Sequence, residues 1–194
     1  MNLVDAINVV KPHLTKERFE HTLRVAETAR DLANRFHESE DKAQISAIFH
    51  DYAKYRSLDE MKRIIKETYL PKDLLYYHHE LWHGPVASIL IEREYGITDM
   101  AIQQAIYCHT TGKAHMSNLD MILFTADYIE PGRSFPGLDE VRDMANRDLL
   151  KATWLVSRNT INYLIMKNQR IYPDTFHAYN DILKRINGGM MNEK

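Results

Sequence analysis

The sequence has a single cysteine, Cys108, so no disulfide can form within the chain. This cysteine content is typical of a protein kept in a reducing compartment. No stretch approaches the roughly 18 consecutive apolar residues of a membrane span. The first residues, MNLVDAINVVKPHL, include an acid and no long apolar core, which does not resemble a signal peptide. We therefore expect a soluble, cytoplasmic protein with no membrane partner.

An excess of charge of one sign is also lacking. The 25 Lys and Arg residues face 27 Asp and Glu residues, which gives a formal net charge of −2 at pH 7. No long basic run occurs, whereas tight binding to a nucleic-acid backbone requires a strongly basic surface. We therefore expect no nucleic-acid partner, although the composition still allows a local basic pocket.

Glycine and proline are scarce, with 7 and 6 occurrences in 194 residues. They separate segments in which apolar residues recur at the helical period, and no segment shows convincing strand alternation. A hydrophobic content of 44% is enough for one well-buried core. The sequence predicts an all-α protein of about eight to nine helices in a single domain over residues 1–194. The motifs described below lie within about 16–135, and C-terminal helices over 138–187 complete the fold.

Capping and breaking residues indicate where the helices begin and end. Thr15 is a reasonable N-cap for a helix that runs to about Phe36. The sequence SLDE at 57–60 has the pattern of a capping box, and Pro71 is expected to end the helix that it opens. Further helices are expected over about 41–55, between Pro85 and Gly96, after Thr98 or Asp99, after Ser117, and over 138–168 and 173–187.

Five expected helices carry ionisable side chains on or beside the apolar face. These residues are His21, His50, Asp51, His83, His109 and Asp127. Burying an ionisable group is costly unless it is paired or bound to a metal ion, so a shared metal site would relieve the cost at every position. A single inward histidine is nevertheless more often an ordinary core residue. Periodicity alone leaves both interpretations open, and we assign His78 and His79 to the surface.

The order of these six residues resembles the HD-domain superfamily of all-α, metal-dependent phosphohydrolases. The extra histidines between the His50-Asp51 pair and Asp127 resemble its binuclear subgroup. The flanking sequence is similar to the bacterial YqeK-type symmetrical diadenosine tetraphosphate hydrolases. The supporting stretches are HTLRVAETA at 21–29, FHDYAK at 49–54, HGPVAS at 83–88, CHTTG at 108–112, ADYIEPGRSFPG at 126–137 and IYPDTFHAYN at 171–180. This resemblance covers nearly the whole chain and implies one HD domain over residues 1–194.

The resemblance implies two divalent transition-metal ions bridged by Asp51. The first ion would be held by His21, His50, Asp51 and Asp127, and the second by Asp51, His83 and His109. Imidazole and carboxylate donors without a thiolate favour iron, with manganese, cobalt or zinc as alternatives. Two cations that share a water molecule lower its pKa, so that a hydroxide can attack phosphorus near neutral pH. Asp127 would act as a ligand or as the proton acceptor, and the sequence does not separate these roles.

A polyphosphate substrate requires basic residues around the metal ions. Lys54 lies three positions after Asp51, and Arg24 lies three positions after His21, so helical spacing directs both toward the site. We therefore include Lys54 among the catalytic residues, and count His21 among the substrate contacts. Arg133, in the loop after the Asp127 helix, is a third candidate for binding phosphate. The alternative interpretation is that each of these basic side chains is an ordinary solvated charge.

The nucleoside contacts are the least visible part of the site. Arg170, Ile171 and Tyr172 precede Pro173 in an extended turn, where an aromatic ring could stack on a base. The resemblance implies that this turn lies near the active site, but an ordinary core tyrosine explains Tyr172 equally well.

The function expected from the resemblance is hydrolysis of diadenosine tetraphosphate at its central linkage, with ADP as the product. Other nucleotide phosphohydrolases or phosphodiesterases of the superfamily, such as a guanosine polyphosphate hydrolase, would use similar ligands. A nucleotide-binding protein without catalysis is a further alternative, against which the complete ligand set argues. A homodimer is left open.

Overall fold

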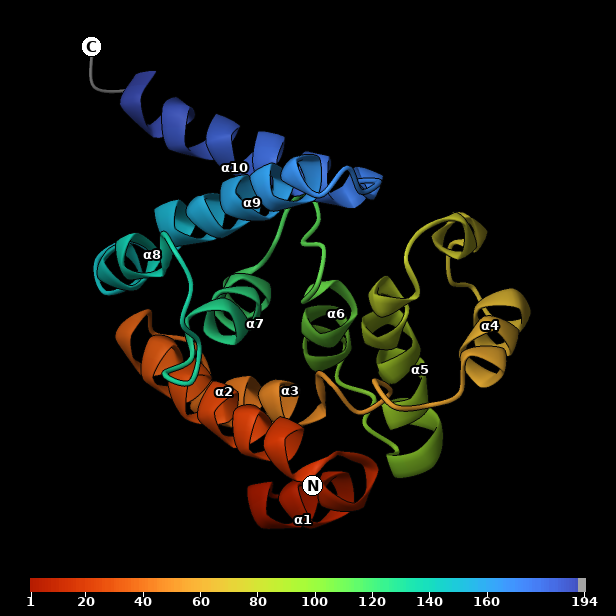
Figure 1. Cartoon of the computed structure of the whole chain (residues 1–194). Helices are drawn as coiled ribbons and strands as arrows, with labels where there is room; N and C mark the ends of the chain where they lie inside the picture. The colour runs from red at the N-terminus through yellow and green to blue at the C-terminus, as the bar shows by residue number, and fades with distance from the viewer. Residues whose placement is uncertain (192–194) are drawn as a thin grey trace.

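The computed structural model describes residues 1–191, which form ten α-helices and three short 3-10 helices (Figure 1). The α-helices are α1 (Leu3–Val10), α2 (Lys16–Arg35), α3 (Glu40–Phe49), α4 (Leu58–Glu67), α5 (His83–Tyr95), α6 (Met100–Cys108), α7 (Asn118–Ile129), α8 (Leu138–Ala145), α9 (Leu149–Met166) and α10 (Pro173–Met191). The 3-10 helices are η1 (Lys11–His13), η2 (Lys72–Tyr76) and η3 (His79–Leu81). No strand occurs in the described residues, so the predicted all-α class is confirmed. Among these helices, none combines the length and the apolar character that a bilayer crossing requires.

The count of ten α-helices exceeds the predicted eight to nine for two reasons. α1 precedes the first expected helix and is capped by Asn2, whose side-chain oxygen accepts a hydrogen bond from the Asp5 N–H at 2.9 Å. The segment 138–168 forms two helices instead of one. Asp148 has an extended backbone there and caps α9 by accepting a hydrogen bond from the Lys151 N–H at 3.0 Å. An N-cap inside a segment of helical period thus interrupts it.

The prediction of one helix over 41–55 is wrong, because α3 ends at Phe49. The Nδ1 of His50 lies 2.6 Å from the carbonyl oxygen of Ala47, which would accept the Asp51 N–H if the helix continued. Residues 50–55 instead form tight turns, in which the Lys54 N–H bonds to the Asp51 carbonyl oxygen at 2.9 Å. Lys54 and Asp51 therefore do not share an α-helical face.

α6 ends in the same way as α3. The Nδ1 of His109 lies 2.7 Å from the carbonyl oxygen of Ile106, three residues earlier. In both cases a histidine at the C-terminal cap position bonds to the last turn of its own helix. Two of the candidate metal ligands are thus fixed by the helix ends that carry them.

Other helix boundaries follow the sequence signals closely. Thr15, Asp99 and Ser117 cap α2, α6 and α7 through their side chains, as predicted. Gly96 ends α5 with a φ of 65°, a left-handed conformation that glycine adopts without strain.

Two helix ends and one capping contact differ from the prediction. At 57–60 only half of the capping box forms, since Glu60 accepts a hydrogen bond from Arg56 instead of from the Ser57 backbone. α4 ends at Glu67, before Pro71 is reached. α10 continues through the two glycines at 188–189, which were expected to end it, as far as Met191.

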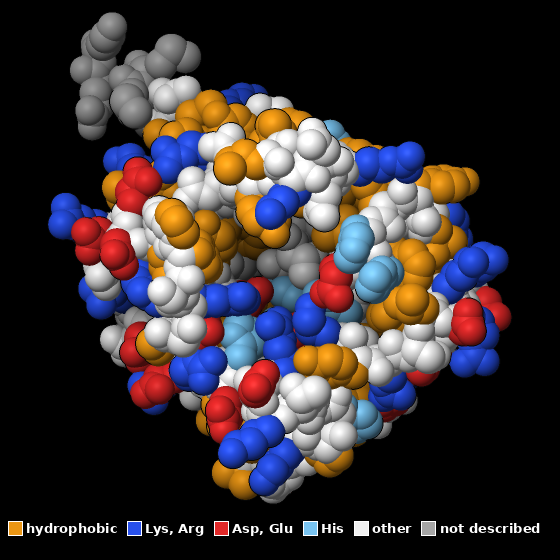
Figure 2. Space-filling model, in the orientation of Figure 1, with side chains coloured by type: hydrophobic (Ala, Val, Ile, Leu, Met, Phe, Trp, Pro, Cys, Tyr) orange, Lys and Arg blue, Asp and Glu red, His pale blue; other side chains and the backbone are white. Residues whose placement is uncertain are grey.

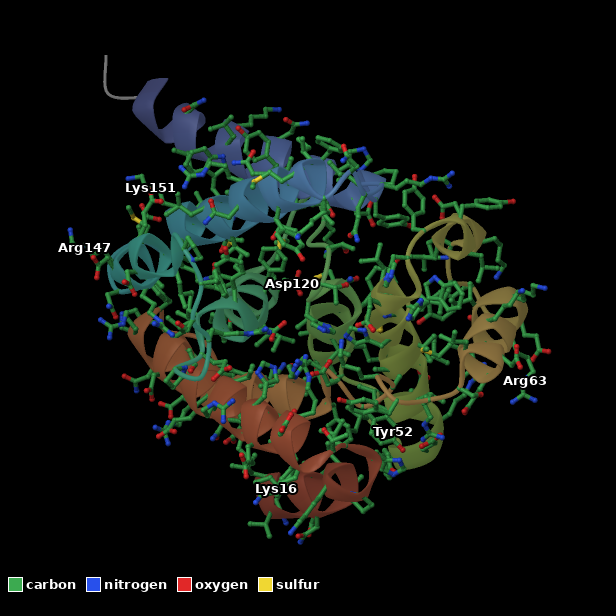
Figure 3. All side chains as sticks on the ribbon, viewed as in Figure 1. Lys16, Tyr52, Arg63, Asp120, Arg147 and Lys151 are labelled. Carbon is green, nitrogen blue, oxygen red and sulfur yellow. The ribbon has the colours of Figure 1, made fainter. Side chains whose placement is uncertain are left out.

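The helices pack so that five segments meet in the middle of the protein (Figure 1). α2 packs on α3 and α7, and α6 packs on α3, α5 and α7. α9 covers α7 and α8, and α10 packs on α9. Fully buried Phe49, Ile106, Ile122 and Leu123 belong to the resulting core. Charged side chains such as Lys16, Arg63, Arg147 and Lys151 project outward (Figure 3).

Candidate metal centre

Six side chains from five segments converge between these helices. They are His21 in α2, His50 and Asp51 directly after α3, His83 at the start of α5, His109 after α6 and Asp127 in α7. His50 and Asp51 are fully buried, and the other three histidines are at most 5% exposed. The Asp127 side chain keeps 17% of its surface exposed. The structure thus brings together all six residues that the sequence analysis selected.

The nitrogen and oxygen atoms of the six residues lie at ligand-to-ligand distances. The Nε2 of His21 is 3.1 Å from Asp127 Oδ1, and the Nε2 of His50 is 2.9 Å from Asp51 Oδ2. The Nε2 of His83 is 3.2 Å from Asp51 Oδ1 and 3.0 Å from the Nε2 of His109. Two donors at a right angle on one ion, with bonds of about 2.1 Å, are about 3 Å apart. The observed spacing matches donors that surround metal ions.

Asp51 lies between two sets of donors. Its Oδ2 faces His50 and, at 3.9 Å, His21, whereas its Oδ1 faces His83. We call His21, His50 and Asp127 the first ligand group, and His83 and His109 the second ligand group. The Nε2 of His50 lies near donors of both groups, since His50, Asp51 and His109 also form a compact triplet. A carboxylate that faces both groups is suited to bridge two ions.

The buried donors lack the partners that a metal ion would supply. The Nδ1 atoms of His50 and His109 bond to backbone carbonyl oxygens, so they carry protons and leave the Nε2 atoms directed inward, where they would coordinate an ion. The Nε2 atoms of His21 and His50 and the Oδ1 of Asp51 are buried without a hydrogen-bond partner. Such unpaired buried groups are rare in native proteins. The residues present therefore fit a metal centre.

The charges of the six residues also suit metal binding. Burial, together with His83 and His50, holds the pKa of His109 well below its usual value, so the ring is neutral and can coordinate. Burial alone would raise the pKa of Asp51, but His50 and His83 hold it well below its usual range. Burial opposes a low pKa at Asp127 as well, and the neighbouring His21, His50 and Arg133 side chains overcome it. Both acids are therefore carboxylates.

Glu130 is a buried residue that the sequence analysis missed. Its side chain is 2% exposed, and its Oε1 lies 3.1 Å from the Nδ1 of His21. Its Oε2 accepts hydrogen bonds at 2.6 Å from Arg24 Nε and from the Gly132 N–H. A metal-binding histidine commonly donates its second nitrogen to such a carboxylate, which orients the ring and makes it more basic. Glu130 is therefore placed to orient His21.

Three arginines approach the first ligand group. The Nε of Arg18 donates to Asp51, and Arg133 lies 2.9 Å from Asp127 Oδ1. Arg24, expected to point at the metal ions, bonds to Glu130 and reaches the site through it. Arg18 was missed, although it lies three positions before His21 on one face of α2. The face in Figure 2 shows basic and histidine side chains around a hollow below α9 and α10.

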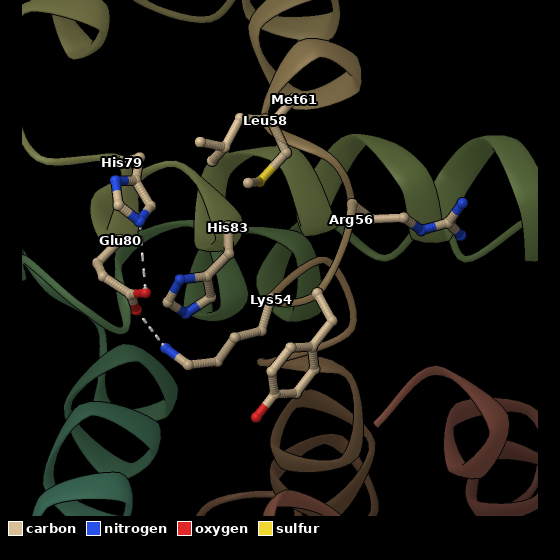
Figure 4. A pocket seen from close by; sticks show the side chains of 8 residues that line it. Lys54, Arg56, Leu58, Met61, His79, Glu80 and His83 are labelled. Atoms are coloured by element: carbon tan, nitrogen blue, oxygen red, sulfur yellow. Dashed lines mark hydrogen bonds and ion pairs between the residues drawn. The ribbon is translucent and has the colours of Figure 1, made fainter. Parts of the chain in front are cut away.

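Lys54 lies on the side of the second ligand group. Its Nζ is 2.6 Å from Glu80 Oε2, and its side chain passes beside the ring of His83 (Figure 4). Lys54 therefore lies beside the site, as expected. It extends from a turn, however, and not from the helical face that the sequence analysis assumed. Glu80 and His79, in η3, complete this edge of the site and were not selected from the sequence.

The turn at 170–172 is fixed to η2. Tyr172 is 5% exposed, its ring contacts Tyr77 edge to face, and its hydroxyl lies 3.4 Å from Asp73. Arg170 donates to the carbonyl oxygen of Tyr76 at 3.0 Å, and Ile171 is half-buried. Within residues 1–191, no hydrogen bond or ion pair joins this turn to the six central residues. Tyr172 thus belongs to the hydrophobic core, and its contact with a nucleoside stays a prediction.

The chain is similar to known proteins in sequence and in structure. The chain matches the HD domain family over residues 18–132. It is 48% identical to the symmetrical bis(5'-nucleosyl)-tetraphosphatase of Halalkalibacterium halodurans, covering 94% of this chain and 98% of that protein. It is also 48% identical to the Bacillus subtilis protein of the same name, covering 93% and 97%. The crystal structure of a predicted HD superfamily hydrolase involved in NAD metabolism from Clostridium acetobutylicum superposes with a TM-score of 0.89 at 34% identity, covering 95% and 98%.

Proposed function

This chain belongs to the HD domain family of metal-dependent hydrolases, and we propose that it hydrolyses diadenosine tetraphosphate at the central phosphate linkage to give two ADP. The relatives named for symmetrical cleavage match it over nearly their whole length. The observation that carries the proposal is the convergence of four imidazoles and two carboxylates, with basic side chains beside both ligand groups. Phosphate-binding groups on both sides suit a substrate that extends in both directions from the bond to be cleaved.

In this proposal the six central residues hold two divalent transition-metal ions. The first ligand group and Asp51 bind one ion, and Asp51 and the second ligand group bind the other. The mixture of nitrogen and oxygen donors favours iron, and manganese, cobalt or zinc also suit it. When bound, the two ions make water nucleophilic near neutral pH and neutralise the charge that develops on the phosphoryl oxygens.

The side chains around the ligands position the substrate and the proton. Arg133 presents a planar guanidinium beside the first ligand group, which suits phosphate oxygens. Lys54 supplies a point charge beside the second ligand group and stabilises the phosphate of the leaving ADP. Asp127 is the more exposed of the two central carboxylates, which supports a role in orienting the attacking water or in accepting its proton.

Chromatography of reaction products tests this function. The protein is loaded with iron, manganese or cobalt and given a panel that contains diadenosine tetraphosphate, guanosine polyphosphates and cyclic dinucleotides. ADP as the only product from diadenosine tetraphosphate, with loss of activity after chelation, is the expected result. ATP and AMP in equal amounts would contradict symmetrical cleavage. Magnesium alone is expected to activate poorly, because it prefers oxygen ligands to imidazoles.

A further inference from the structure

A cavity of about 270 Å³ lies directly beside His83, between the segment 54–61 and η3 (Figure 4). Its lining divides into a charged part, which holds Lys54, His79 and Glu80, and an apolar part. Pockets for whole drug-sized ligands span about 300–1,000 Å³. The size of this cavity therefore suits one half of a dinucleotide and not the whole molecule.

The apolar part of the lining consists of Tyr55, Leu58 and Met61. Met61 is 2% exposed and closes the cavity, whereas Tyr55 and Leu58 are 53% and 48% exposed. A flat aromatic base gains stability from an aromatic ring and aliphatic side chains of this kind. Arg56 also borders the cavity, but its guanidinium points away from it and bonds to Tyr52 and Glu94.

In the charged part, a carboxylate occupies the position of an anion. Glu80 Oε2 lies 2.6 Å from Lys54 Nζ, and Glu80 Oε1 lies 3.9 Å from the Nε2 of His79 (Figure 4). The Lys54 side chain is only 19% exposed, whereas that of Glu80 is 51% exposed. Glu80 can therefore rotate into solvent, while Lys54 stays beside His83. A phosphate group that replaces this carboxylate would meet Lys54 and His79.

We propose that this cavity binds one ADP half of the substrate, with the adenine and ribose on Tyr55, Leu58 and Met61. The phosphate next to that nucleoside displaces Glu80 from Lys54. This inference rests on the proposed function, because it assumes a substrate with a nucleoside at each end. It assigns one nucleoside to the segment 54–61, whereas the contacts expected at the turn 170–172 stay a prediction. The second ADP half then lies on the side of Arg133.

Steady-state kinetics with diadenosine tetraphosphate and the metal-loaded protein test the nucleoside contact. Leu58→Glu places a charge on the apolar wall, and Leu58 is the first residue of α4, where an acid is compatible with the helix. Met100→Glu is the matched control, since Met100 is the exposed first residue of α6 and lies outside the cavity. We expect Leu58→Glu to raise KM about tenfold, and Met100→Glu to leave KM and kcat unchanged.

Two further variants separate the parts of the proposal. Tyr55→Ala adds no charge and is expected to raise KM in the same direction as Leu58→Glu. Glu80→Gln removes the competing carboxylate and is expected to lower KM about threefold, because the neutral amide releases Lys54 more easily. An unchanged or raised KM for Glu80→Gln would overturn the displacement of Glu80.

The outcomes distinguish this inference from the function on which it rests. If the wild-type protein releases ADP, but Leu58→Glu and Tyr55→Ala have the KM of the Met100→Glu control, the nucleoside does not bind in this cavity. If the metal-loaded wild-type protein releases no ADP, the proposed function itself is wrong. Product inhibition by ADP provides a second measurement, and its inhibition constant is expected to rise together with KM.

Discussion

The two ligand groups of the centre are held by different kinds of contact. In the first, charged side chains hold two of the three ligands: Glu130 orients His21, and Arg133 is paired with Asp127, while His50 bonds to a backbone carbonyl. In the second, His109 bonds to a backbone carbonyl and packs against Gly84. The Nδ1 of His83 is buried and has no hydrogen-bond partner. Charge changes at Glu130 or Arg133 should therefore weaken the first group, whereas a change in backbone packing at Gly84 should disturb the second.

Asp51 belongs to both groups, and its removal is expected to have the largest effect. Asp51→Ala should abolish hydrolysis and release more metal than any other single ligand change, because each ion loses its shared anionic donor. Asp51→Asn keeps the size of the side chain but removes its charge, and it should lose nearly as much activity and bound metal. Elemental analysis, circular dichroism and turnover measure the effect, with His50→Ala as the milder comparison. Near-normal turnover in folded Asp51→Ala protein would contradict the proposed binuclear site.

The second prediction tests whether side chains hold the first ligand group. Glu130→Gln should lower metal affinity there by about tenfold to a hundredfold, because the neutral amide no longer orients His21 as an anion. The ion at the second ligand group should be retained. Titration of the metal-loaded protein with chelators of graded strength resolves the two ions.

Arg24→Gln is the matched control for Glu130→Gln. It removes one hydrogen-bond donor to Glu130 but leaves the contact between Glu130 and His21 in place. Its effect on metal affinity should therefore be smaller. Equal losses of both ions in Glu130→Gln would show that Glu130 supports the fold in general and not His21 in particular.

The convergence of the six residues was predicted only by the resemblance to the HD-domain superfamily, because apolar periodicity directs His21 and Asp127 inward without showing that they meet. The fold class could be predicted from the residues themselves, because it depends on local periodicity. The caps at Thr15 and Ser117 were visible for the same reason, since a cap is a contact across three residues.

Contacts across long stretches of sequence could not be predicted in this way. Glu130 is 109 residues from His21, and no spacing rule connects them. The end of α3 depends on the imidazole of His50 bonding to the helix carbonyl at Ala47, which propensities do not include. Lys54 was expected beside the site for a helical reason, but a turn and Glu80 determine its position.

The third prediction compares the basic residues of the two sides. Lys54→Ala and Arg133→Ala should each reduce kcat/KM about tenfold, because each removes a charge from the bound phosphates. Lys54→Ala should leave metal content unchanged, since the Lys54 ammonium pairs with Glu80 and not with a ligand residue. Arg133→Ala should also lower the affinity for the ion at the first ligand group slightly, because Arg133 pairs with Asp127. Kinetics and elemental analysis of both variants measure this difference. Unchanged kinetics in both variants would show that Lys54 and Arg133 are ordinary surface charges.

The smallest effects are expected from two glycines, one beside each ligand group. A Cβ at Gly84 would lie 3.0 Å from the Ile106 carbonyl oxygen and 3.1 Å from the Nδ1 of His109. The three atoms nearest to a Cβ at Gly132 would all belong to the guanidinium of Arg24, at 2.5–2.7 Å. Backbone atoms cannot move aside as easily as the end of an arginine side chain. Gly84→Ala should therefore cost about 1–3 kcal/mol in the free energy of unfolding, and Gly132→Ala should cost less.

The two glycine variants also sharpen the contrast between the ligand groups. Gly84→Ala displaces His109, so it should lower the affinity for the ion at the second ligand group about twofold to fivefold. The affinity for the ion at the first ligand group should not change. Gly132→Ala moves Arg24 away from Glu130, so any loss should fall on the first ion. Thermal unfolding of metal-free protein and chelator titration of loaded protein measure these effects separately. A Gly132→Ala variant that loses the second ion, or a Gly84→Ala variant that loses the first, would contradict the division between side-chain and backbone support.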